Sequence, residues 1–177
     1  ISGDASNGLF RIGANGVLTV CDCQGDGKIE ETGNIAHNPV FLHSGGTLNL
    51  YSGTIASRIT AVVIDEDPSA TITNSEGGTV NVYGGTASST GSDSQAIKVN
   101  AALTGTDVSI SGGEVTSPNN GISSESGAIR ISGGSITAQN GYALDIGNTS
   151  SKVYLSGSPV ISGGSAGDED TALLPSN

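Results

Sequence analysis

The sequence predicts an all-β protein, a right-handed three-sided parallel β-helix of about six rungs. Three observations lead to this fold class. Pairs of apolar residues spaced two apart recur along the 177 residues, most pairs are followed by a bend that contains glycine, and no window shows the 3.6-residue period of a helix. A repeat of this kind, with three short strands per turn, is typical of a solenoid.

The first strand of each repeat has two inward-facing residues with one outward-facing residue between them. These pairs are Leu18/Val20, Leu48/Leu50, Val80/Val82, Val108/Ile110, Ile129/Ile131 and Val153/Leu155. They are separated by 30, 32, 28, 21 and 24 residues, so we expect the additional residues of the longer repeats to form loops at the corners.

The second and third strands follow each first strand. In five repeats the second strand is anchored seven residues after the first apolar residue of the pair, at Ile55, Ala87, Val115, Ile136 and Val160. The first repeat differs, because an insertion moves its anchor to Ile29. The third strand contains Phe10/Ile12, Val40/Leu42, Val62/Ile64, Ile97/Val99, Ile122 and Leu144/Ile146. Together these strands predict one β-helix domain over residues 1–164 and a tail or linker over residues 165–177.

The composition is unusual for a folded domain, because Gly, Ser and Thr make up 70 residues. A coil explains it. Stacked Ile, Val and Leu side chains fill a narrow core, and Gly, Ser, Asn and Asp form the corners. Six Lys and Arg against 17 Asp and Glu give a formal charge of −11, so we expect no nucleic-acid partner. No apolar run is long enough for membrane insertion.

Three segments carry a family resemblance: GGTLNLYSGTI (45–55), ISGGEVTSPNNGI (110–122) and ISGGSITAQNGYALDI (131–146). They resemble repeats of right-handed parallel β-helix proteins of the pectate-lyase-like superfamily, and most closely the non-catalytic carbohydrate-binding and adhesin-like domains of bacterial surface proteins. The resemblance implies an extracellular protein, secreted or attached to the cell surface, with further domains in a larger surface protein. It implies a polysaccharide or glycan as the partner.

Catalysis is not expected. Glycoside hydrolases need two carboxylates facing one cleft, whereas the charged residues on the outward face of the first strands are Asp107, Arg130 and Lys152. The catalytic patterns of the lyases and hydrolases with this fold have no match in the sequence, which leaves a polysaccharide lyase or glycoside hydrolase as the weaker alternative.

The repeat places Tyr51 beside Tyr83 and Asn49 beside Asn81 on the outward surface of neighbouring first strands. Aromatic rings flanked by amides are suited to sugars, because the rings contact CH groups and the amides bond to hydroxyls. We therefore expect a non-catalytic module that recognises polysaccharide or host glycan. The alternative is a structural adhesin stalk or spacer without a ligand, in which these pairs only stabilise neighbouring rungs.

An acidic run, Asp65, Glu66 and Asp67, follows a third strand at a corner. The repeat aligns four polar residues there on successive rungs: His43, Asp65, Asn100 and Glu125. Converging oxygen atoms can hold Ca²⁺, and the resemblance implies calcium for acidic sugars. A solvated acidic loop is the other interpretation, and no cofactor is required.

The chain has two cysteines, Cys21 and Cys23. Extended backbone separates residues i and i+2 too far for an unstrained disulfide, although a bend at Asp22 would bring them closer. The two alternatives are a strained bridge and a pair of free thiols.

Overall fold

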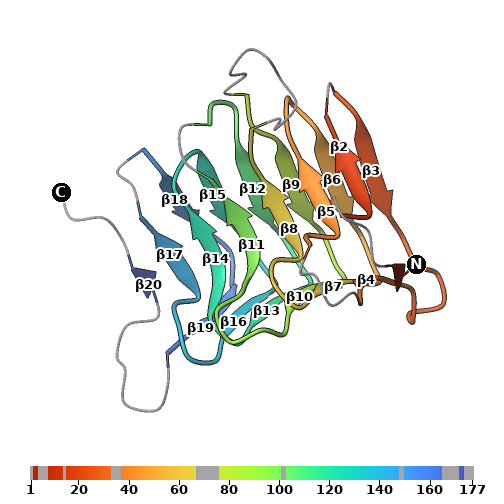
Figure 1. The fold of residues 1–177 in the computed structure, drawn as a ribbon. Helices are drawn as coiled ribbons and strands as arrows, with labels where there is room; N and C mark the ends of the chain where they lie inside the picture. Colours follow the sequence, from red (N-terminus) through yellow and green to blue (C-terminus); the bar gives the residue numbers. More distant parts are fainter. Residues whose placement is uncertain are drawn as a thin grey trace.

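The computed structural model describes residues 2–3, 8–13, 15–32, 37–66, 76–100, 103–147, 150–164 and 172–173. The fold is a three-sided parallel β-helix, as the sequence predicted (Figure 1). Within the described residues every named element is a strand, and all pairings between strands are parallel. None of these residues forms a helix with the length and hydropathy to cross a membrane.

In the described part of the chain, twenty strands form three sheets, and each complete rung passes from sheet B to sheet C and then to sheet A. Sheet A contains β1 (Ser2–Gly3), β4 (Lys28–Glu31), β7 (Thr54–Ser57), β10 (Thr86–Ser89), β13 (Glu114–Ser117), β16 (Ser135–Ala138) and β19 (Val160–Ser162). Sheet B contains β2 (Phe10–Ile12), β5 (Val40–Leu42), β8 (Val62–Ile64), β11 (Gln95–Val99), β14 (Asn120–Ser124), β17 (Leu144–Ile146) and β20 (Ala172–Leu173). Sheet C contains β3 (Val17–Val20), β6 (Thr47–Leu50), β9 (Thr79–Val82), β12 (Asp107–Ile110), β15 (Ala128–Ile131) and β18 (Lys152–Leu155).

The strands from β2 to β19 make six complete rungs, which confirms the predicted number. Strands β1 and β20 pair with the first and last rungs and lie at opposite ends of the coil (Figure 1). Strand β20 lies within residues 165–177, the segment that the sequence assigns to a tail or linker.

The core is made of ladders of identical or similar apolar side chains. Leu48, Val80, Val108 and Ile129 occupy one such ladder on successive strands of sheet C, and each is fully buried. Burial of a side chain of this size contributes roughly 1.5–3 kcal/mol. Stacking of branched side chains therefore fills the interior without Trp or Met, both of which the sequence lacks.

One predicted inward position is wrong. The sequence places Val160 in the core, but Ile136 pairs with Ile161, and Val160 pairs with Ser135. Val160 is 61% exposed, whereas Ile161 packs against the core. The corner between β18 and β19, residues 156–159, is one residue longer than the corner at 132–134 that precedes β16, so the alternation moves by one position.

Glycines with a left-handed backbone form the corner between sheets C and A. Gly85, Gly113 and Gly134 have φ values of +71°, +71° and +72°. A Cβ at Gly113 would lie 2.4 Å from the carbonyl oxygen of Gly85 on the neighbouring rung. This corner requires glycine for two reasons, the backbone conformation and the close approach of the next rung.

Replacing Gly113 by Ala tests this second reason against a matched control. Gly105 also has a positive φ, +67°, but a Cβ there would meet nothing within 4 Å. Gly105→Ala should cost about 1–2 kcal/mol from backbone strain alone. We expect Gly113→Ala to lower the midpoint of urea unfolding, followed by circular dichroism, clearly more than Gly105→Ala does. Equal losses would show that contact between rungs does not constrain the corner.

Candidate functional site

The outward surface of sheet C brings together the predicted tyrosines. Tyr51 and Tyr83 directly follow β6 and β9, and their backbone amides donate to Val20 and Leu50 on the preceding rungs, each at 2.9 Å. This register puts the two rings one above the other, with centroids 4.6 Å apart and planes 15° from parallel. The side chains are 49% and 46% exposed. The structure therefore contains a stacked, solvent-accessible tyrosine pair.

The stacking decides which ring surfaces are free. Because the rings stack from rung to rung, one face of each ring covers the other, and the second face points along the axis of the coil. The free face of Tyr83 points toward the rung of Ser111, whose backbone amide donates to Val82. Ser111 and the serine at the same position on the next rung, Ser132, are exposed and small. An open aromatic face therefore stands beside a serine-covered surface.

The predicted amide pair lies on the same two strands. Asn81 Nδ2 donates to Asn49 Oδ1 at 2.9 Å, and the backbone positions of the two residues pair directly. Within the described residues, the Nδ2 group of Asn49 and the Oδ1 atom of Asn81 have no other partner. Beside the rings, the NH2 group of Asn49 and the carbonyl oxygen of Asn81 thus remain available to a further molecule.

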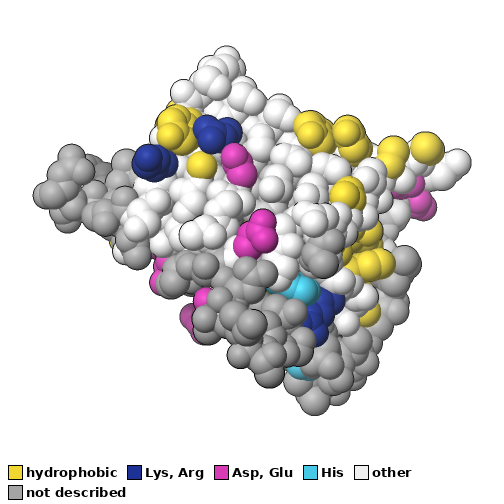
Figure 2. Space-filling view, turned by 90° about the horizontal axis from the view of Figure 1, so that it is seen from above, with side chains coloured by type: hydrophobic (Ala, Val, Ile, Leu, Met, Phe, Trp, Pro, Cys, Tyr) yellow, Lys and Arg dark blue, Asp and Glu magenta, His cyan; other side chains and the backbone are white. Residues whose placement is uncertain are grey.

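A second aromatic group on sheet C was not identified from the sequence. Arg130 Cζ lies 4.7 Å from the centroid of the Tyr154 ring, and Arg130 Nε donates to Asp107 Oδ2 at 3.1 Å. Arg130 and Tyr154 occupy equivalent positions in successive repeats, a signal that was present in the sequence. In the view from above, hydrophobic side chains form separate groups along one edge of the molecule with polar surface between them, and one group adjoins Lys or Arg side chains (Figure 2).

The predicted calcium corner is only partly described, because Asp67 lies outside the described residues. Asp65 Oδ1 accepts from the backbone amide of Glu66 at 2.8 Å, and Asp65 Oδ2 accepts from Asn100 Nδ2. Backbone bonds place His43, Asp65, Asn100 and Glu125 on successive rungs, as the repeat indicates. No group of three or more His, Cys, Asp or Glu side chains in the described part of the chain is arranged to hold a metal ion. Calcium binding stays a prediction.

Cys21 and Cys23 are free and exposed in this structure. The residue between them fixes their loop. Asp22 Oδ1 accepts from the amide of Gln24 at 2.9 Å, and Asp22 Oδ2 accepts from the amide of Gly27 at 2.8 Å. The bond from Gly27 has the larger effect and the bond from Gln24 the smaller, and together they hold the pKa of the Asp22 carboxyl group below its ordinary value of 3.8.

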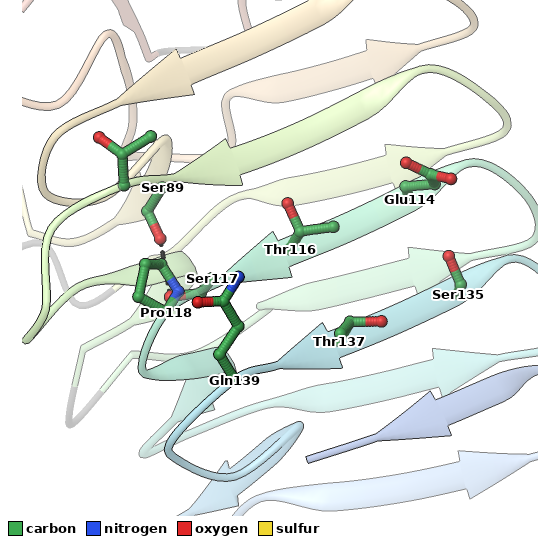
Figure 3. A pocket seen from close by; sticks show the side chains of 9 residues that line it. Ser89, Glu114, Thr116, Ser117, Pro118, Ser135, Thr137 and Gln139 are labelled. Carbon is green, nitrogen blue, oxygen red and sulfur yellow. Dashed lines mark hydrogen bonds between the residues drawn. The ribbon is translucent and has the colours of Figure 1, made fainter. Parts of the chain in front are cut away.

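A groove lies on a different side of the coil, on the outward surface of sheet A (Figure 3). Its volume is about 540 Å³. Glu114 and Ser135 lie at one end, Thr116 and Thr137 in the middle, and Pro118 and Gln139 at the other end (Figure 3). The lining is therefore mostly hydroxyl groups, with one carboxylate and one amide.

Corner length explains the position of the groove. Two residues, 118–119, connect β13 to β14, whereas five residues, 90–94, connect the matching positions on the preceding rung. On the following rung the corner between matching positions is one residue longer, 139–143 against 118–121. The short corner thus lies between two longer ones. Buried hydroxyls fix this end, because Ser89 Oγ donates to Ser117 Oγ at 2.8 Å and Ser117 Oγ donates to the Ser94 carbonyl at 2.8 Å. The sequence showed the short repeat of 21 residues, but the groove was not predicted from it.

No protein-family model, no curated protein and no solved structure matches this chain.

The tyrosine stack should contribute to stability, and a double-mutant cycle measures its contribution. Tyr51→Ala, Tyr83→Ala and the double variant should give a coupling energy of about 0.5–1.5 kcal/mol in urea unfolding, because stacked rings gain this much beyond burial. Tyr51 and Tyr154 form the control pair, since four rungs, roughly 19 Å, separate them. Their effects should add. Additive effects for Tyr51 and Tyr83 would contradict a stabilising stack.

The carboxyl group of Asp22 should titrate below 3.8 in a ¹³C NMR experiment. Its pKa is lower in the folded than in the unfolded chain, so its stabilisation is present above the unfolded value and is lost as the pH falls through the folded value. Asn at this position has one oxygen in place of two, so it cannot accept the Gln24 and Gly27 amides at separate side-chain atoms. The difference in thermal midpoint between wild type and Asp22→Asn should therefore shrink as the pH falls below 3.8. A titration at or above 3.8 would show that the loop does not favour the ionised form.

Proposed function

We propose that this domain is an extracellular, non-catalytic binding module that recognises a polysaccharide or host glycan through sheet C. The observation that supports this most is the stacked pair of Tyr51 and Tyr83, whose rings are each almost half exposed on a surface otherwise rich in small polar residues. Exposed aromatic rings with adjacent amide groups suit ligands that present both CH groups and hydroxyls. The resemblance to carbohydrate-binding β-helix domains agrees with this proposal.

In this function, the CH face of a pyranose packs on the free face of Tyr83. Its hydroxyl groups reach the Nδ2 group of Asn49 and the Oδ1 atom of Asn81, which have no other partner among the described residues. The stack and the amide bond hold all four side chains in place before a ligand arrives, which reduces the entropy lost on binding. One module with a site of this size binds weakly, and repeated units along a polymer increase the overall affinity.

Charge favours a neutral glycan. The formal charge of −11 opposes an acidic polymer, and Arg130, which lies on the same sheet, already pairs with Asp107. An acidic glycan would require Ca²⁺ at Asp65, Glu66 and Asp67, the corner that the sequence indicates for this ion.

The absence of catalysis is part of the proposal. Hydrolysis of a glycosidic bond requires two carboxyl groups about 5–10 Å apart on either side of that bond. The described residues that line the groove include one carboxylate, Glu114. In sheet C, Asp107 is engaged with Arg130.

A second candidate function is a rigid spacer without a ligand. Contacts within each pair favour this function, because the two tyrosine rings stack on each other and the two asparagine side chains share a hydrogen bond. Such ladders stabilise neighbouring rungs whether or not a ligand exists.

A glycan-retention experiment separates these functions. Wild type should be retained on at least one insoluble neutral polysaccharide, and Tyr83→Ala should reduce retention by roughly 3- to 10-fold, the factor that corresponds to loss of one aromatic contact. Tyr154→Ala is the matched control, because Tyr154 is a 47% exposed tyrosine of the same sheet outside the pair. Its retention should equal that of wild type.

The same panel with EDTA tests calcium, and release of reducing sugar or unsaturated product tests catalysis. Lack of retention on every polysaccharide would favour the spacer. Equal losses for Tyr83→Ala and Tyr154→Ala would place the site away from the stacked pair, and released product would overturn the non-catalytic assignment.

A further inference from the structure

We propose that the groove on sheet A is a second binding site, for a neutral sugar unit, and that it acts independently of the tyrosine pair on sheet C. The groove lies between the corners of three successive rungs, over β13 and β16 (Figure 3). Its volume of about 540 Å³ is within the range of pockets that hold small ligands, roughly 300–1,000 Å³.

Five polar side chains of the groove make no hydrogen bonds to the rest of the described chain. Glu114, Thr116, Ser135, Thr137 and Gln139 make no side-chain hydrogen bond or ion pair with any other described residue. This differs from the buried serines at the end of the groove, which bond to each other. The groove thus has a fixed wall beside side chains whose hydrogen-bond donors and acceptors are free to bond to a ligand.

Register sets the spacing of these groups. Glu114 pairs with Ser135 and Thr116 with Thr137 on neighbouring rungs. Adjacent rungs are about 4.8 Å apart, and alternate residues of a strand are roughly 6.6 Å apart. Four polar side chains therefore form a rectangle comparable in size with the hydroxyl positions around a pyranose ring, and the ring of Pro118 offers an apolar surface beside it.

The lining chemistry selects the class of ligand. Hydroxyl and amide groups can donate and accept with a polyhydroxylated molecule. Glu114 adds an acceptor, and the groove lining described contains no Lys or Arg, so an anionic ligand would meet an uncompensated carboxylate. These groups favour a neutral mono- or disaccharide over a uronic acid.

Two sites on different sides of one rod have a functional consequence. A ligand on sheet C and a ligand on sheet A bind without overlap, because the two sheets form different sides of the coil (Figure 1). One module can therefore contact two glycan chains, or two units of a branched chain, and gain affinity from double attachment.

NMR titration tests the second site. Cellobiose, maltose and lactose are added to the ¹⁵N-labelled protein, with galacturonic acid as the acidic comparison. We expect at least one neutral disaccharide to shift the amides of Thr116, Thr137 and Gln139 in a saturable way, and galacturonic acid to leave them unchanged. No saturable shift with any of the three, or an equal response to galacturonic acid, would overturn the proposal.

Variants identify the contacts. Thr137→Val removes a hydroxyl at nearly constant volume, and combined with Gln139→Ala it should weaken binding about 10-fold, since each lost hydrogen bond costs roughly 0.5–1.5 kcal/mol. Thr54→Val is the matched control, because Thr54 is a half-buried threonine of sheet A, outside the groove lining. Unchanged affinity in the double variant, or an equal loss in Thr54→Val, would overturn the site.

The Tyr51→Ala/Tyr83→Ala variant distinguishes this proposal from the preceding one. If the groove amides still shift in this variant, the second site stands, even where polysaccharide retention through the tyrosines fails. If the variant abolishes the shifts at Thr116 and Thr137, the sugar binds at the tyrosine pair and the groove proposal is wrong.

Discussion

Parallel hydrogen bonding between successive rungs sets the register of all three sheets. Each inner strand of a described sheet pairs with the strands one turn before and one turn after it, so its residues have fixed partners on the neighbouring rungs. A shift of one residue would exchange the inward and outward faces of a strand. The corners must therefore bring the chain back to the same register, and the backbones approach so closely there that Gly113 leaves no room for a side chain.

The same constraint determines the surface. Residues at equivalent positions are held about 4.8 Å apart, a distance at which rings stack, amides bond to each other and hydroxyls pair. Tyr51 and Tyr83, Asn49 and Asn81, and Ser89 and Ser117 are three examples. A continuous ladder of this kind leaves little for a ligand, because its members satisfy one another.

Surfaces suited to a ligand arise where a ladder is interrupted. The tyrosine ladder ends at Ser111, which leaves one face of Tyr83 open. The groove on sheet A forms where corner 118–119 is shorter than the corners of the rungs on either side. In both places the backbone register is preserved and the change lies only in side-chain size or corner length. Function in such a coil can therefore vary without a change of fold.

The amino-acid pattern was sufficient to predict the fold, the order of the strands and the pairing of Tyr51 with Tyr83, because a spacing of two residues within strands and a recurring order of strands require these features. It did not predict that Ile161 replaces Val160 in the core, nor the groove on sheet A. Both depend on the number of residues in a corner and on the lengths of the neighbouring corners. The stacking of the tyrosine rings and the two amide bonds to Asp22 became visible in the folded chain. Alternation is a property of one strand, whereas contact between side chains depends on the geometry of neighbouring rungs and of the corners that join them.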